Sequence, residues 1–200
     1  MWLFKRNRTL IFLRSGFYSK ASIRAAFPIL TVIFLFSSSI HSVDFDQVYE
    51  YYKKGNYDTL VKVSRSGLRS GELDYKILLL YVASESSLEE IDKTLLSIYS
   101  RSKDQPSIFY NSVFLFLERA LVLESYESGT RWGKIFLTKG ESSVRYSEGV
   151  YTYACILYSS QDYEAANSIL AKLKSVPTDS KLGKRIRILE MNLEKRKEEK

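Results

Sequence analysis

The residue types that most often perform chemistry are scarce in this chain. Its 200 residues include one histidine, His41, and one cysteine, Cys155. A Ser-His-Asp or Cys-His arrangement needs a histidine beside its nucleophile, and a His/Cys zinc site needs several such ligands. Cys155 lies between Ala154 and Ile156 in an apolar stretch, which favours a buried, inert thiol. We therefore expect no metal, no cofactor and no internal disulfide.

Residues 129–135, with the sequence GTRWGKI, match a phosphate-binding loop only superficially. Three residues instead of four separate the two glycines. Ile135 stands where a Ser or Thr would bind magnesium. These two departures argue against a nucleotide site.

Glu118 is the one carboxylate whose surroundings could support acid catalysis. It lies in a largely apolar helical pattern, where burial would raise its pKa. A lone acid beside Arg119 is, however, more often paired or solvent-facing. An enzyme or enzyme subunit of the cell envelope, acting on cell-wall glycans with Glu118 as the acid, is therefore the alternative function. The main interpretation is non-enzymatic and depends on the helical elements.

Residues 147–180 contain two helical patterns separated by a short polar turn. Apolar or small residues recur in both with the i, i+3, i+4, i+7 spacing of one helix face. They are Val150, Tyr153, Ala154, Leu157 and Tyr158 in the first pattern, and Ala166, Ile169, Leu170 and Leu173 in the second. Neither helix can bury its stripe alone, so antiparallel packing closes one face and leaves another for a neighbour.

The turn between these patterns occurs a second time near the start of the helical region. Residues 51–58, YYKKGNYD, align without gaps on residues 157–164, LYSSQDYE. Gly55 and Asn56 suit the left-handed conformation that ends a helix, and Asn56 or Asp162 can cap the helix that follows. The two copies lie about three repeat lengths of 34 residues apart, which leaves room for two degenerate units between them.

This spacing resembles the tetratricopeptide repeat (TPR), whose pattern is W-x2-L-G-x2-Y, then A-x3-F, then P. Ala166 and Leu170 match the A-x3-F pair, whereas Pro177 falls one residue early and Leu60 replaces the crossing Ala in the first copy. The resemblance implies an all-α fold: a short right-handed α-solenoid of about four helical hairpins with a C-terminal capping helix. An ordinary antiparallel helix pair within a bundle is the alternative.

The rest of the chain also has helical patterns. Ser86 with Glu89, and Ser87 with Glu90, form two overlapping capping boxes. Glycines interrupt residues 130–139, which makes that helix the weakest. The apolar stripes are Ile91, Leu95 and Ile98; Phe109, Val113, Phe116, Leu117 and Ala120; and, in the final helix, Leu182, Ile186, Leu189 and Leu193. The single narrow stripe of the final helix is typical of a terminal cap.

Residues 1–42 have the features of a secretory signal peptide. They contain no acid, and their six basic residues precede an apolar run at residues 27–36 and small residues up to Ser42, after which we expect cleavage. The apolar segment is short for a membrane span, which needs about 20 residues. We expect a periplasmic or secreted protein; a mitochondrial transit peptide is the alternative, and an uncleaved leader would tether the domain to a membrane as a structural protein.

The leader accounts for most of the positive charge. The whole chain carries +7, but without residues 1–42 the remaining 24 basic residues face 23 acidic ones, a net charge of +1. A nucleic-acid binder needs a concentrated cationic face. The basic residues of the C-terminal tail alternate with glutamates, which indicates a solvated helix face. We therefore expect no nucleic-acid partner.

The domain predicted for residues 43–200, with a capping helix and charged tail at 179–200, is expected to be a non-catalytic interaction or scaffold module. Its partner is expected to be a protein or peptide of the cell envelope. In TPR-like repeats the first helix of each hairpin lines a concave groove. Registering the hairpins by the turn residues Tyr57, Leu88, Tyr126 and Tyr163 places near the groove Tyr49, Tyr52, Lys76, Asn111, Glu118, Tyr151 and Tyr158. Tyrosines are enriched at binding surfaces, although such rings can also fill the core between repeats.

Overall fold

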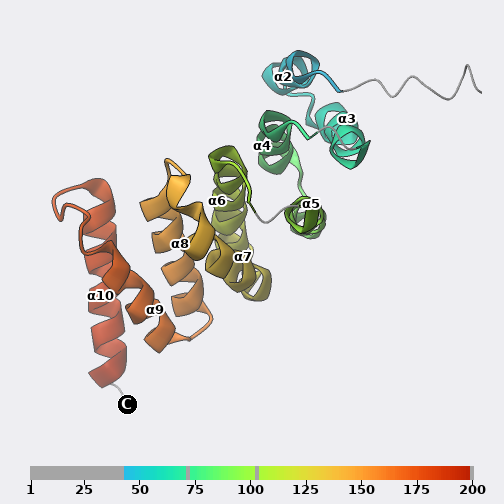
Figure 1. Cartoon of the computed structure of the whole chain (residues 1–200). Helices are drawn as coiled ribbons and strands as arrows, with labels where there is room; N and C mark the ends of the chain where they lie inside the picture. Colours follow the sequence, from blue (N-terminus) through green and yellow to red (C-terminus); the bar gives the residue numbers. More distant parts are fainter. Residues whose placement is uncertain (1–42, 71–72, 102–103, 199–200) are drawn as a thin grey trace, which may run out of the picture. The chain divides into compact units, whose positions relative to one another are not determined.

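The computed structural model describes residues 43–70, 73–101 and 104–198 (Figure 1). Within these ranges the chain is helical and has no strand, which confirms the predicted all-α class. The predicted signal peptide, residues 1–42, lies outside the described residues. The α-helices are α2 (Phe45–Lys53), α3 (Tyr57–Ser70), α4 (Tyr75–Ser84), α5 (Leu88–Arg101), α6 (Ser107–Val122), α7 (Tyr126–Lys139), α8 (Tyr146–Ser159), α9 (Tyr163–Leu170) and α10 (Lys181–Glu198). Two short 3₁₀ helices, η1 (Gly140–Ser142) and η2 (Ala171–Leu173), follow α7 and α9.

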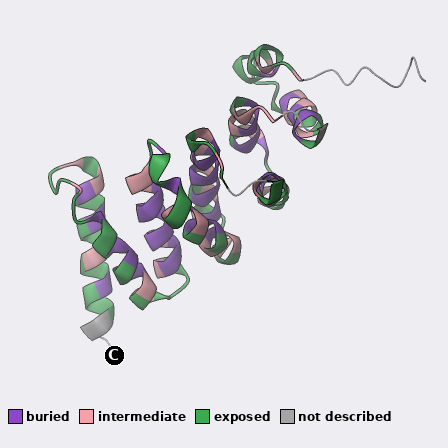
Figure 2. Ribbon diagram, viewed as in Figure 1, coloured by how far each residue is buried: buried purple, intermediate pink, exposed green. Residues whose placement is uncertain are grey.

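Alternate helices pack against one another along the chain. Helix α4 contacts both α2 and α6, and α8 contacts both α6 and α10. Helices α3, α7 and α9 each pack against the preceding helix and the following helix. Helix α5 packs against α6. Helices α6 and α8 consequently carry the largest numbers of buried residues, as Figure 2 shows. The even-numbered helices thus form a continuous internal row.

The apolar stripes predicted from the sequence form this interior. One cluster of buried side chains extends from α2 to α7 and includes Ile156 of α8, and a second joins α8, α9 and α10. Ile91, Leu95 and Ile98 are all buried on α5, and Ile186, Leu189 and Leu193 on α10. Because α10 buries only this one stripe, it leaves Ile188 and Met191 exposed on its other side.

Within the described residues, the turns that follow α2, α6 and α8 share one geometry. Gly55, Glu124 and Gln161 have positive φ angles of 69°, 56° and 68°. In each turn the following N–H donates to the carbonyl five residues earlier, as Asn56 does to Tyr51 over 3.0 Å. This is the Schellman arrangement that ends a helix. The second helix then begins with a tyrosine in all three cases.

Side-chain caps start two of these second helices as the sequence predicts. The Asn56 side chain accepts a hydrogen bond from the N–H of Thr59, and the Asp162 side chain accepts one from the N–H of Ala165. The α4–α5 turn is different. Ser87 caps α5 by accepting from the N–H of Glu90, but the Ser87 N–H donates to Glu85 rather than to Glu90. Of the two hydrogen bonds predicted for the Ser87–Glu90 capping box, the one from the Glu90 N–H to the Ser87 hydroxyl is confirmed. The reciprocal one is wrong, because the Ser87 N–H donates to Glu85.

The glycines of α7 do not interrupt it as the sequence predicted. The helix is continuous from Tyr126 to Lys139, and Gly129 and Gly133 lie on its buried side. A Cβ atom on Gly133 would collide with the ring of Tyr153 on α8. The absence of side chains at these positions thus permits α7 and α8 to pack closely, which favours the helix despite the low helix propensity of glycine.

Candidate functional site

Three of the residues predicted to bind a partner lie together near α2. Tyr49 and Tyr52 are 42% and 38% exposed. Their rings stack with centroids 6.5 Å apart, and Tyr49 also stacks on Phe45 at 5.7 Å. The row continues to Tyr57, whose ring meets that of Tyr52 at 5.9 Å. We call Phe45, Tyr49, Tyr52 and Tyr57 the α2 aromatic ladder.

Cations adjoin this ladder on two sides. Lys76, the predicted binding residue of α4, places its ammonium 5.4 Å from the ring centroid of Phe45. Lys53 lies 5.1 Å from that of Tyr49. Cation–π contacts of this kind, together with ring stacking, order side chains that would otherwise move freely in solvent. The ladder is therefore an exposed but structured aromatic surface.

The other four predicted residues lie on α6 and α8. Tyr151 is only 9% exposed and packs under the Arg185 guanidinium, 4.6 Å from its ring centroid. Tyr158 is half-buried against Tyr163, and Asn111 accepts a hydrogen bond from the Ser143 hydroxyl at 2.8 Å. Glu118 is exposed on α6. The structure thus brings Tyr49, Tyr52 and Lys76 together, while Tyr151 contributes mainly to packing.

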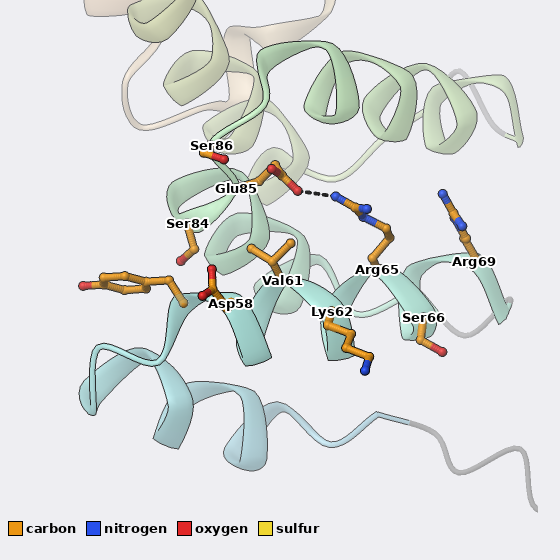
Figure 3. A pocket seen from close by; sticks show the side chains of 10 residues that line it. Asp58, Val61, Lys62, Arg65, Ser66, Arg69, Ser84, Glu85 and Ser86 are labelled. Atoms are coloured by element: carbon orange, nitrogen blue, oxygen red, sulfur yellow. Dashed lines mark hydrogen bonds and ion pairs between the residues drawn. The ribbon is translucent and has the colours of Figure 1, made fainter.

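A polar cleft that the sequence did not reveal lies between α3 and the α4–α5 turn (Figure 3). Its volume is about 650 Å³. Helix α3 contributes the cations Lys62, Arg65 and Arg69. Their i, i+3 and i+7 spacing places their backbone positions on one face, but the Lys62 side chain projects away from Arg65 and Arg69 in Figure 3. In Figure 3 the side chains of Arg65 and Arg69 project from α3 toward the same side, and Glu85 faces Arg65.

Glu85 is the anchor of this cleft. It is 5% exposed, and its carboxylate accepts hydrogen bonds from the Arg65 guanidinium and, over 2.9 Å, from the N–H of Ser87. Burial by itself would raise the pKa of Glu85, but these two hydrogen bonds and the charge of Arg65 outweigh it and hold the pKa below its usual value. Glu85 is thus a carboxylate at neutral pH and neutralises part of the charge of Arg65.

Helix α6 fixes the backbone of the same turn. The Arg119 guanidinium donates to the carbonyl oxygens of Val82, at 2.9 Å, and Ser86, at 3.1 Å, and also to that of Glu85. These carbonyls would otherwise be unpaired because α4 ends at Ser84. Arg119 of α6 therefore fixes the backbone of the α4–α5 turn, which forms one wall of the cleft.

A second cleft continues along α3 toward α5. It has a volume of about 340 Å³ and shares Arg65 and Arg69 with the first cleft. Its α5 wall includes Glu90, Lys93, Thr94 and Ser97. We call the two adjoining clefts together the α3 groove.

Three buried polar atoms near the α3 groove have no hydrogen-bond partner within the described part of the chain. They are the hydroxyls of Ser64 and Ser84 and the Nε atom of Arg65. Arg65 and Ser84 both line the first cleft. A buried polar group without a partner costs about 1–3 kcal/mol, so its retention calls for a physical explanation.

The α3 groove was missed because its sequence signal is weak. The spacing of Lys62, Arg65 and Arg69 is visible in the sequence, but the same spacing occurs on many solvated helix faces. What distinguishes the site is Glu85, which lies twenty residues from Arg65 in the sequence and meets it only in the fold.

Comparisons with known proteins give no relative: no family model, curated protein or solved structure matches this chain. Over residues 43–70, 73–101 and 104–198, no group of His, Cys, Asp and Glu side chains is arranged to hold a metal ion. In the same ranges, none of the helices has the length and apolar character needed to cross a membrane.

Proposed function

We propose that the protein is a non-catalytic interaction module, which holds a segment of a partner protein against a stack of helical hairpins. The arrangement we propose is a right-handed α-solenoid of about four TPR-like hairpins, with α10 as the cap. This arrangement is supported by the packing of the even-numbered helices, because α2, α4, α6, α8 and α10 each contact the next one in this series. The turn shared by three hairpins adds to this support, because repeated local geometry is typical of repeat proteins.

The observation that carries the proposal is the α2 aromatic ladder. Tyr49, Tyr52 and Tyr57 are between 38% and 48% exposed, and their rings contact one another, stacked between Tyr49 and Tyr52 and edge-on between Tyr52 and Tyr57. A protein partner that covers ordered aromatic rings gains apolar contact at a low cost in side-chain entropy. Lys76 beside the ladder supplies a polar contact at its edge.

We further propose that the partner belongs to the cell envelope and that the protein is periplasmic or secreted. The support is the sequence of residues 1–42, with its acid-free basic region and short apolar run. A mitochondrial location is the alternative, since the same composition occurs in transit peptides.

Site-specific photocrosslinking in the native cells tests the interaction. A photoreactive phenylalanine analogue replaces Tyr49 in one variant and Lys172 in a control variant. Lys172 is exposed on η2, far along the chain from the ladder. We expect a discrete crosslinked product at position 49 only, and we expect Tyr52→Ala in the same chain to reduce its yield.

Two results would contradict the proposal. One is the absence of a product at position 49 while the variant is folded and correctly located. The other is the same set of products from positions 49 and 172, because that would indicate random collisions rather than a defined partner.

A further inference from the structure

We propose that the α3 groove binds an acidic peptide segment in an extended conformation. This inference rests on the proposed function, because it names the chemistry of one segment of the partner. The α3 groove shares only Tyr57 with the α2 aromatic ladder, and the inference depends on the cations of α3, so it can fail independently.

The charges of the groove are incompletely neutralised. Arg65 pairs with Glu85 and, at 3.8 Å, with Glu90, while Lys93 pairs with Glu89 at 2.6 Å. Lys62 and Arg69 form no ion pair within the described residues. Asp58 is the only acid of the first cleft that likewise lacks such a pair there. Among the described residues the groove thus has two cations and one acid outside any ion pair, a balance that favours an anionic occupant.

Acidic side chains offer what the exposed cations of the groove can bind. Lys62 and Arg69 line the first cleft and are exposed, so the carboxylates of a bound peptide can reach them. Carboxylate oxygens accept charge-assisted hydrogen bonds from ammonium and guanidinium groups, which are stronger than bonds between neutral groups.

The length of the groove fits a short peptide. From Asp58 to Arg69 the helix rises about 1.5 Å per residue, or about 17 Å in all. An extended chain advances about 3.3 Å per residue, so about five residues span the same distance. The combined walls of α3, the α4–α5 turn and α5 are long enough for a segment rather than for a single small anion.

The lining of the groove argues against a single-stranded nucleic acid. Such a ligand needs several aromatic rings on which its bases stack. Among the described residues, Tyr57 is the one aromatic residue that lines either cleft.

Fluorescence anisotropy with the full-length protein tests the inference directly. The probe is a labelled pentaglutamate peptide with blocked ends, and the matched probe is pentaglutamine. We expect pentaglutamate to bind at least about tenfold more tightly, a difference of about 1.4 kcal/mol. The binding should weaken as salt rises, because the contacts of Lys62 and Arg69 are exposed and screened.

Two double variants localise the binding. Lys62→Gln with Arg69→Gln removes the unpaired cations of the groove, and Lys172→Gln with Lys174→Gln removes the same charge from exposed positions elsewhere. Because all four residues are exposed, both variants should fold. We expect the groove variant to bind pentaglutamate at least fivefold more weakly, by about 1 kcal/mol, and the control variant to bind within twofold of the parent.

Three results would overturn the inference. Equal binding of the two peptides would show that carboxylates are not recognised, and equal losses in the two double variants would show only a general attraction to the basic chain. Displacement of the peptide by micromolar inorganic phosphate would assign the groove to a small anion instead. If crosslinking at position 49 persists in any of these cases, the groove inference alone has failed and the interaction module stands.

Discussion

Glu85 is the residue at which three helical hairpins meet. Its carboxylate binds Arg65 of α3, and its backbone carbonyl accepts from Arg119 of α6. We predict that Glu85→Gln lowers the free energy of unfolding by about 2 kcal/mol at neutral pH, because the guanidinium of Arg65 loses its principal buried partner. Denaturation in urea measures the change. Glu90→Gln is the matched control, since Glu90 is more exposed and lies 3.8 Å from Arg65.

The same carboxylate makes part of the stability depend on pH. Its folded-state pKa lies below the unfolded value, so the stabilisation is present above the unfolded pKa and is lost as the pH falls through the folded pKa. The stability of the parent should therefore approach that of Glu85→Gln in acid. A constant difference between the two proteins across this range would show that the ionised form of Glu85 is not what stabilises the fold.

Tyr151 makes the stability depend on pH in the alkaline range, with a sign opposite to that of Glu85: stability falls as the pH rises. Burial, reinforced by a hydrogen bond with Cys155, raises the pKa of Tyr151 to about 12 from a reference value of 10.0. The neutral phenol is favoured in the folded state, so stability is complete below about pH 10 and falls as the pH rises toward about 12. We predict that Tyr151→Phe loses less stability over this interval than the parent, as measured by urea denaturation. An identical alkaline loss in both proteins would refute the prediction.

At the scale of single residues, the sequence predicted local chemistry better than long-range pairing. Gly55 in the left-handed region and the caps at Asn56 and Asp162 follow from neighbouring positions. The pairing of Glu85 with Arg65 depends on the packing of α3 against α4, which no local pattern contains. Tyr151 was predicted to face a partner because tyrosine suits both cores and surfaces, and packing against α10 decided its burial.

The helix-ending turns make a prediction at the scale of elements. Glu124 and Gln161 adopt positive φ angles, which cost a residue with a Cβ atom more than they cost glycine. We predict that Glu124→Gly and Gln161→Gly each raise the free energy of unfolding by about 0.5 kcal/mol, because the relief of backbone strain exceeds the cost of the entropy that glycine adds to the unfolded chain. Thermal unfolding of the single variants measures this.

Gly55 provides the reciprocal control. A Cβ atom there would meet no other atom within 4 Å, so Gly55→Ala tests the backbone conformation alone. It should lower stability by about 1 kcal/mol. If Gly55→Ala were neutral and the glycine substitutions destabilising, the positive φ angles would not be limiting at these turns.

Helix boundaries were predictable where the apolar periodicity agreed with the turn and capping residues. Tyr57, Leu88, Tyr126 and Tyr163 were chosen from the sequence as turn residues, and they are the first residues of α3, α5, α7 and α9. The predicted start of α7 at residue 130 was four residues late. Helix α9 is shorter than its apolar stripe predicted, because the α-helix ends at Leu170 and the chain continues as the 3₁₀ helix η2. Leu173, the last residue of the stripe, is still buried. For α7, propensity was misleading: the ring of Tyr153 occupies the space that a side chain at position 133 would need.

At the scale of the whole molecule, the sequence predicted the helical class, which the described residues confirm. The α3 groove arises between neighbouring hairpins, where α3 and α5 are separated by the α4–α5 turn. That turn is the one that departs from the repeated Schellman geometry. A site formed where a repeat pattern changes is hard to predict, because the pattern itself is the source of the prediction.

Export of the protein is the prediction that concerns the chain as a whole. Residues 1–42 contain six basic residues and no acid, followed by a short apolar run, so we predict cleavage after Ser42 in the native cells. Removal changes the formal net charge from +7 to +1 and so weakens general attraction to acidic molecules. Intact mass and N-terminal sequencing of the native protein measure this directly. A mass that includes residue 1 would refute cleavage, and an intact leader with the protein in the membrane fraction would favour the tethered alternative. If cleavage occurs, pentaglutamate binding by the processed protein should still depend on Lys62 and Arg69, because the α3 groove lies wholly within residues 43–200.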